Sequence, residues 1–253
     1  MEMTSHPLLL FVFSFLLLWS VAMAGQFIQR RIRPFKEGES EDFKLVVTAI
    51  MTLMGLLIGF TFSMAVERYD QRKLYEEQEA NAIGTEYLRA DVLPKGTAEI
   101  VKALLRDYVS MRLRFYTARD PDELKSLNRD TSLLHEKLWT AVKEPASANP
   151  NPVMAQAMVG MNDVINSQGY TQYAWHNRIP TEAWILMMLI SFWCNGLAGY
   201  GAKRMNSLNL FIVPFAVSVS FLLIADIDSP RSGMIVVRAQ DLRILQQSLN
   251  GNY

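Results

Sequence analysis

The chain contains a single cysteine, Cys194, among its 253 residues, so no disulfide can form within it. It also has no excess of charge, because 25 lysines and arginines balance 25 aspartates and glutamates. No arm or tail is strongly basic, so nothing indicates a nucleic-acid partner. The three histidines, His6, His135 and His176, are scattered and do not have the spacing of zinc ligands.

Sequence motifs for enzymatic chemistry are missing as well. The chain has no glycine-rich phosphate loop, no nucleophile elbow and no zinc signature. Glu86 and Arg89 lie one helical turn apart, a spacing that favours an ion pair over a pair of catalytic groups. We therefore predict that the protein is not an enzyme and carries no cofactor.

Long hydrophobic runs, in contrast, are abundant. Half of the residues are hydrophobic, and they gather at residues 8–28, 43–66, 183–200 and 208–225. Each run has about 18–24 residues, enough to cross a hydrocarbon core of about 30 Å as a helix. Because lipid offers no partners to backbone polar groups, we predict four transmembrane helices in a cell membrane, the inner membrane in a Gram-negative bacterium.

The first run has an alternative interpretation as a cleaved signal peptide, because Ala-Met-Ala at residues 22–24 resembles a cleavage site. However, no lysine or arginine precedes the run, and the basic cluster Arg30, Arg31 and Arg33 follows it. This order of charges favours a retained helix.

The distribution of basic residues does not decide the orientation in the membrane. One side carries Arg30, Arg31, Arg33, Lys36, Lys44, Lys203 and Arg204, and the other carries Arg68, Arg72, Lys73, Arg178, Arg231, Arg238 and Arg243. The short loops are denser in charge, which favours placing them in the cytoplasm and the large polar region outside. The resemblance described below implies the opposite orientation, so the side of the polar region stays open.

The polar region between the second and third runs, residues 67–180, is predicted to be a helical extramembrane domain. It separates a first transmembrane pair (1–66) from a second (181–228), and a tail (229–253) is expected to pack on the domain or on a neighbouring subunit. Residues 67–91 contain no proline, so they should continue the second transmembrane helix until Pro94 and Gly96 end it. With no strand expected, the predicted fold class is an all-α membrane protein.

Further helices are predicted inside this domain. An amphipathic helix should face a partner through Ile100, Leu104, Tyr108, Met111 and Phe115. Asp120 and Pro121 have the residue types of an N-cap and a first helical position, and they should begin a helix that runs to about Lys143. Residues 146–152 are expected to form a loop and residues 153–173 the last helix of the domain. A tail helix is expected near residues 239–249.

Two neighbouring stripes of the second transmembrane helix are candidates for function. Gly55, Gly59 and Ser63 share one face, and small residues at this spacing allow close packing of another helix. The adjacent stripe consists of Thr52, Leu56 and Phe60. On a lone helix, this stripe would contact lipid or the protein core. In a ring of subunits it would form stacked apolar rings, a constriction that gates by dewetting, and phenylalanine edges there could tolerate an anion.

Two acids, Asp226 and Asp228, follow the fourth run at the expected edge of the membrane. Their carboxylates could supply oxygen ligands to a divalent metal ion. The alternative, which we favour, is a turn at the membrane interface formed by Asp228, Ser229 and Pro230.

Residues 59–69, which contain Gly59, Phe60 and Arg68, resemble the stretch where the pore-lining helix of bestrophin channels leaves the neck. Residues 80–90 and 228–233 are similar to bacterial proteins with a bestrophin-like domain. The pattern of Asp226, Asp228, Pro230 and Gly233, with Asp241 and Leu242 further on, is similar to the segment after the last bestrophin span.

This resemblance implies a homopentameric channel that conducts inorganic anions such as chloride across the lipid bilayer, with its large domain in the cytoplasm. It places the pore constriction at Thr52, Leu56 and Phe60. The chain departs from the family at Thr52, which is polar where an aliphatic residue is preferred. Residues 234–238 lack the acidic run that clasps calcium in animal bestrophins. The competing hypothesis is a non-conducting membrane scaffold or sensor whose helical domain binds a partner, with the Thr52, Leu56 and Phe60 stripe buried against its own other spans.

Overall fold

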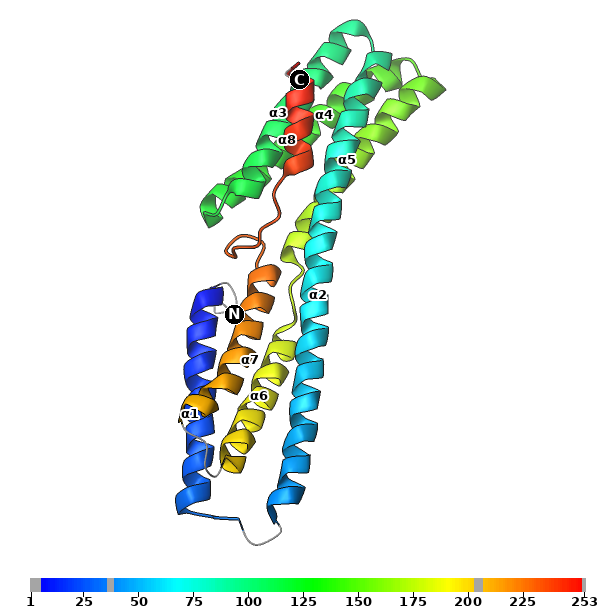
Figure 1. Ribbon diagram of the computed structural model, residues 1–253. Helices are drawn as coiled ribbons and strands as arrows, with labels where there is room; N and C mark the ends of the chain where they lie inside the picture. Colours follow the sequence, from blue (N-terminus) through cyan, green and yellow to red (C-terminus); the bar gives the residue numbers. More distant parts are fainter. Residues whose placement is uncertain (1–5, 36–38, 203–206, 252–253) are drawn as a thin grey trace. The chain divides into compact units, whose positions relative to one another are not determined.

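The computed structural model describes residues 6–35, 39–202 and 207–251, and within these ranges the chain is all-helical with no strand (Figure 1). The elements are α1 (Pro7–Arg31), α2 (Glu39–Arg89), the 3-10 helix η2 (Ala90–Val92), α3 (Lys95–Thr117), α4 (Pro121–Ala148), α5 (Pro152–His176), α6 (Thr181–Gly201), α7 (Ser207–Asp228) and α8 (Gln240–Leu249). The predicted all-α fold class is confirmed. Lys36, Lys203 and Arg204, which entered the comparison of basic residues, lie outside the described residues.

Four helical segments are long and apolar enough to cross a membrane: Pro7–Arg31, Ser40–Val92, Pro152–Gly201 and Leu210–Asp228. The chain divides into two compact units. The membrane unit comprises Met1–Tyr69 and Arg178–Val236, and the domain unit comprises Asp70–Asn177 and Val237–Tyr253. The second apolar run continues into the polar region as one helix, α2, as its lack of proline predicted.

In the membrane unit, α1 packs against α6 and α7. A methyl group on Gly199 of α6 would overlap the carbonyl oxygen of Ala22, and one on Gly25 of α1 would overlap that of Gly196. Glycine at these positions therefore allows the α1 and α6 backbones to approach closely, as small residues do in membrane helix pairs. This crossing was not among the features predicted from the sequence.

The core of the membrane unit joins α2 to the other helices. Trp184 of α6 meets Phe221 of α7 edge to face, with ring centroids 6.1 Å apart. Met54 and Ala65 of α2 are buried in the same apolar cluster. One face of α2 is therefore packed against its own bundle, which leaves its opposite face uncovered by the described residues of the chain.

Local signals position the helices of the domain unit. Asp120 caps α4 by accepting a hydrogen bond from the Glu123 backbone N–H at 3.0 Å, as predicted. The expected loop at 146–152 is partly wrong, because α4 continues past Pro145 to Ala148. Proline has no backbone N–H to donate, but the Pro145 carbonyl oxygen still accepts a hydrogen bond from the Asn149 N–H at 3.0 Å. The last turn of α4 is therefore hydrogen-bonded.

The buried face of α3 differs from the predicted one. Its buried residues are Ala98, Val101, Leu105, Tyr108, Val109, Arg112, Phe115 and Tyr116. Tyr108 and Phe115 were expected there, but Ile100 is 57% exposed, and Leu104 and Met111 are only half-buried. The helix is rotated because Arg112 points inward to a buried carboxylate, and hydrophobic spacing alone cannot predict a buried arginine.

Candidate functional site

The predicted constriction stripe lies on the uncovered face of α2. Leu56 is 52% exposed and Phe60 is 60% exposed, and Thr52 is exposed as well. An apolar stripe of this kind on a membrane helix must be covered by lipid, by water in a narrow pore or by another subunit. The structure therefore brings the three residues together on one surface, where other molecules can reach them.

The hydroxyl group of Thr52 is already satisfied within α2. Its Oγ1 donates a hydrogen bond to the Thr48 carbonyl oxygen at 2.9 Å. Threonine in membrane helices commonly makes this bond to the preceding turn. The outward surface of Thr52 is therefore less polar than its residue type suggests, which weakens the objection to a threonine in an apolar ring.

The face with Gly55, Gly59 and Ser63 is also free within the chain. A Cβ atom placed on Gly55 or on Gly59 would have no described atom within 4 Å, and Ser63 is exposed. No described helix of the same chain uses this small-residue face. It remains available to a helix from another molecule.

The two candidate metal ligands already have partners. The Asp226 carboxylate accepts backbone hydrogen bonds from Met234 at 2.7 Å and from Ile235 at 2.8 Å. The Asp228 carboxylate accepts from the Ile179 N–H at 3.1 and 3.2 Å. Across the described parts of the chain, no group of three or more histidine, cysteine or acidic side chains could hold a metal ion. Both acids thus tie loops to the end of α7.

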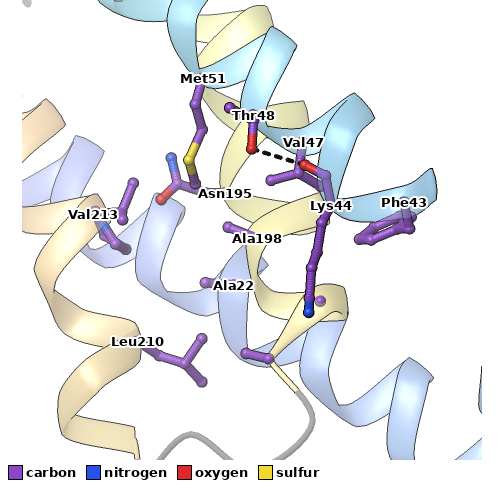
Figure 2. A pocket seen from close by; sticks show the side chains of 13 residues that line it. Ala22, Phe43, Lys44, Val47, Thr48, Met51, Asn195, Ala198, Leu210 and Val213 are labelled. Atoms are coloured by element: carbon purple, nitrogen blue, oxygen red, sulfur yellow. Dashed lines mark hydrogen bonds between the residues drawn. The ribbon is translucent and has the colours of Figure 1, made fainter. Parts of the chain in front are cut away.

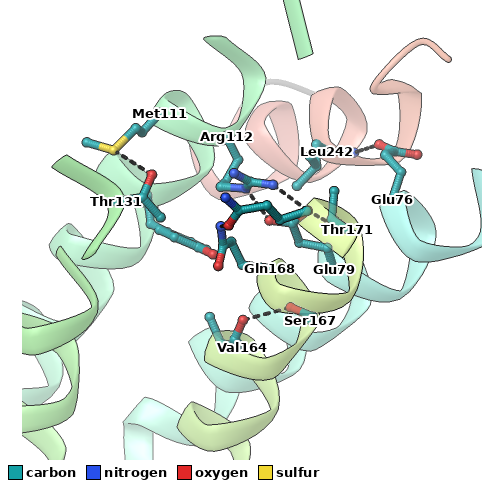
Figure 3. Close-up of polar contacts among 12 residues, drawn as sticks. Glu76, Glu79, Met111, Arg112, Thr131, Val164, Ser167, Gln168, Thr171 and Leu242 are labelled. Atoms are coloured by element: carbon teal, nitrogen blue, oxygen red, sulfur yellow. Dashed lines mark hydrogen bonds and ion pairs between the residues drawn. The ribbon is translucent and has the colours of Figure 1, made fainter. Parts of the chain in front are cut away.

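A buried ion pair, which the sequence analysis did not find, organises the domain unit (Figure 3). The Arg112 guanidinium of α3 pairs with the Glu79 carboxylate of α2 through two contacts, and both side chains are fully buried. Thr171 of α5 donates a third hydrogen bond to Glu79 at 3.0 Å. Burial acts to lower the pKa of Arg112, but the Glu79 carboxylate outweighs it and raises that pKa above its usual range. Together these contacts join α2, α3 and α5.

His135 of α4 lies near this ion pair and is uncharged at neutral pH. His135 Nε2 lies 3.1 Å from the Tyr108 hydroxyl group. Burial, and then the positive charge of Arg112, lower the pKa of His135 to about 4. At neutral pH this imidazole is neutral and serves as a hydrogen-bonding partner rather than as a charge.

Glu86 of α2 is the most unusual ionisable group of the domain unit. Its side chain is fully buried, and neither carboxylate oxygen has a hydrogen-bond partner in the described chain. The prediction that Glu86 forms an ion pair with Arg89 is wrong, although the positive charge of Arg89 is close enough to lower the pKa of Glu86 slightly. Burial is the largest cause and raises the pKa to about 8, with a smaller rise from Asp163. The absence of a side chain at Gly160 leaves room for the carboxyl group.

Comparison with known proteins identifies the family. The family described as Bestrophin-like domain matches residues 16–242, which is most of the chain. Comparison with curated protein sequences returned no match.

Solved structures show the same fold. A bacterial bestrophin homologue from Klebsiella pneumoniae superimposes with a TM-score of 0.70 at 11% identity, covering 95% of this chain and 97% of that one. A tryptophan-to-alanine mutant of the Klebsiella pneumoniae homologue gives 0.68 at 12% identity, covering 96% and 94%. A leucine-to-threonine mutant gives 0.68 at 12% identity, covering 96% and 98%. Identities this low support the fold and not the details of a site.

Proposed function

The chain belongs to the bestrophin-like domain family, and on this premise we propose that it is a homo-oligomeric ion channel of the cell membrane, pentameric and lined by α2. If the source is a Gram-negative bacterium, the membrane is the inner one. The observation that carries the proposal is the free face of α2. Its opposite face is packed in the core of the membrane unit, while Thr52, Leu56 and Phe60 are exposed.

The two neighbouring faces of α2 suit two different roles in a ring. Gly55, Gly59 and Ser63 would let the α2 helix of the next subunit approach closely, because they carry little or no side chain. The adjacent stripe would then face the axis of the ring. There, Leu56 and Phe60 would form a hydrophobic constriction that dewets readily. Within the described residues of one chain, neither face packs against another helix.

We also propose that the channel prefers anions, with chloride as the first candidate. No acidic residue lies between Lys44 and Val66, so this part of α2 presents no fixed negative charge to a permeating ion. The edge of the Phe60 ring carries partial positive charge, which can tolerate an anion at the constriction.

If the protein were a non-conducting scaffold or sensor, the stripe of Thr52, Leu56 and Phe60 should be buried against the other spans of the chain. Leu56 and Phe60 are instead more than half exposed, at 52% and 60%. This exposure supports the channel over the scaffold.

Planar-bilayer recording of purified protein tests the proposal. We expect unitary currents, and Phe60→Ala should change the conductance or the selectivity because it removes the largest side chain of the proposed constriction. Phe62→Ala is the matched control, since Phe62 lies two residues away on a different face of α2 and should leave both unchanged. Absence of unitary currents, or a particle without rotational symmetry in detergent, would overturn the proposal.

A further inference from the structure

A cavity of about 350 Å³ lies within the membrane unit, between α2, α6 and α7 with Ala22 of α1 at its wall. Most of its lining is apolar, with Met51 from α2 and Val213 from α7 among the walls (Figure 2). It lies near the first turns of α2 and the last turns of α6, so it is separate from the Thr52, Leu56 and Phe60 stripe, none of which lines it.

Inside the cavity, one polar atom has no partner. Asn195 of α6 is fully buried, and its Nδ2 donates to the Ser191 carbonyl oxygen at 2.8 Å. Its Oδ1 has no hydrogen-bond partner among the described residues. Figure 2 shows the amide group between Met51 and Val213. An unpaired buried acceptor costs about 1–3 kcal/mol, so a ligand that donates a hydrogen bond here would be favoured.

At its outer end, the cavity carries a cation. Lys44 belongs to the lining, and its side chain is exposed with no carboxylate within 4 Å in the described ranges. Beside it, Phe35, Phe43 and Tyr200 form an aromatic cluster, with Phe35 5.0 Å from Phe43 and 4.9 Å from Tyr200 between ring centroids. No charged residue lies between Lys44 and Glu67, so we place Lys44 at the membrane edge of this span, at the level of the lipid headgroups.

Asn195 lies deeper in the membrane than Lys44. It is more than one turn inside the end of α6 at Gly201, and it faces Met51, which lies about two turns into α2 from Lys44. From the interface inward, the cavity thus presents a positive charge, a hydrogen-bond acceptor and an apolar wall. A ligand that fits this order has an anionic head, a donor just below it and an apolar tail.

We propose that the cavity binds a single-chain anionic lipid of the lysophospholipid class. The phosphate pairs with Lys44, and the free glycerol hydroxyl, which lies between the phosphate and the acyl chain, donates to Asn195 Oδ1. The acyl chain lies along Met51 and Val213. A volume of about 350 Å³ is at the small end of ligand cavities, which favours one chain over the two of a diacyl lipid.

Native mass spectrometry of the purified full-length protein tests this assignment with a matched pair of ligands. The probes are 1-acyl-glycerol-3-phosphate and its 2-deoxy analogue, which has the same charge and chain but no hydroxyl group. We expect the hydroxylated lipid to bind roughly 3–10-fold more tightly, as one hydrogen bond predicts. Equal binding of the two probes, or tighter binding of diacyl phosphatidic acid, would overturn the proposal.

Variants assign the two contacts. Asn195→Leu should abolish the preference for the hydroxyl group, and Lys44→Gln should weaken the binding of both anionic probes. Lys73→Gln, which removes an exposed charge in the domain unit, is the control and should change neither. An Asn195→Leu protein that still discriminates between the probes would contradict the assignment. If this variant does not fold, the ligand pair on the unmodified protein decides alone, and neither result bears on whether α2 lines a pore.

Discussion

Replacing Glu86 by glutamine should remove much of the pH dependence of stability around neutral pH. The native carboxyl group is fully buried and has no hydrogen-bond partner in the described chain. Burial raises its pKa from 4.5 to about 8, against a smaller lowering by Arg89. The group is therefore mostly protonated in the native state at neutral pH, whereas it is ionised in the unfolded chain.

The size and sign of the effect follow from these two pKa values. Because the native state binds the proton more tightly, the contribution of Glu86 to stability is complete below a pH of 4.5 and is lost as the pH rises to about 8. One pKa unit corresponds to about 1.4 kcal/mol, so the free energy of unfolding should fall by about 3–5 kcal/mol over this range. Glutamine has nearly the same shape and does not titrate.

Thermal unfolding in detergent, followed by circular dichroism between about pH 5 and pH 9, measures this difference. The Glu86→Gln protein should match the unmodified protein in acid and should have the higher Tm in base, by on the order of 10 °C. Glu76, whose pKa burial raises to about 7, leaves some pH dependence in both proteins. Glu77→Gln on the same helix is the exposed control. Identical pH profiles for Glu86→Gln and the unmodified protein would refute the argument.

Two further predictions concern packing. Arg112→Met leaves the buried Glu79 carboxylate unpaired and should lower the free energy of unfolding by about 3–5 kcal/mol, measured by chemical denaturation; a second change, Glu79→Leu, should restore most of the loss. Gly199→Val should destabilise each subunit by about 1–3 kcal/mol because the Cβ atom of the new side chain already overlaps the Ala22 carbonyl group. A Cβ atom at Gly55 meets no described atom within 4 Å, so Gly55→Val should instead weaken the oligomer, as measured by size-exclusion chromatography. Loss of subunit stability at Gly55 but not at Gly199 would contradict this reasoning.

Several elements of the fold were readable from the sequence because their causes are local. Apolar runs of sufficient length predict membrane helices, since lipid leaves the backbone no other way to satisfy its polar groups. The absence of proline in residues 67–91 predicted that α2 continues beyond the apolar run. Asp120 and Pro121 predicted the beginning of α4, because capping depends on residues next to each other in the chain.

The interior of the domain was not predictable in the same way. Glu79 and Arg112 are 33 residues apart, and each resembles an ordinary charge on a solvated helix face. Only the packing of α2 against α3 brings them together and excludes water. The same holds for Glu86, whose expected partner Arg89 is close in sequence but does not pair with it in the structure. Spacing of three or four residues allows a pair but does not enforce one.

The sequence by itself determined the class of the protein: a helical membrane chain with a polar domain between two pairs of spans, and an α2 helix that carries a small-residue face beside an apolar stripe. The tertiary structure decided which faces are used within the chain. It placed the close helix crossing at Gly25 and Gly199 and left Gly55 and Phe60 uncovered. Periodicity shows which residues share a face, but only the positions of the other helices determine whether that face is buried or free to meet another molecule.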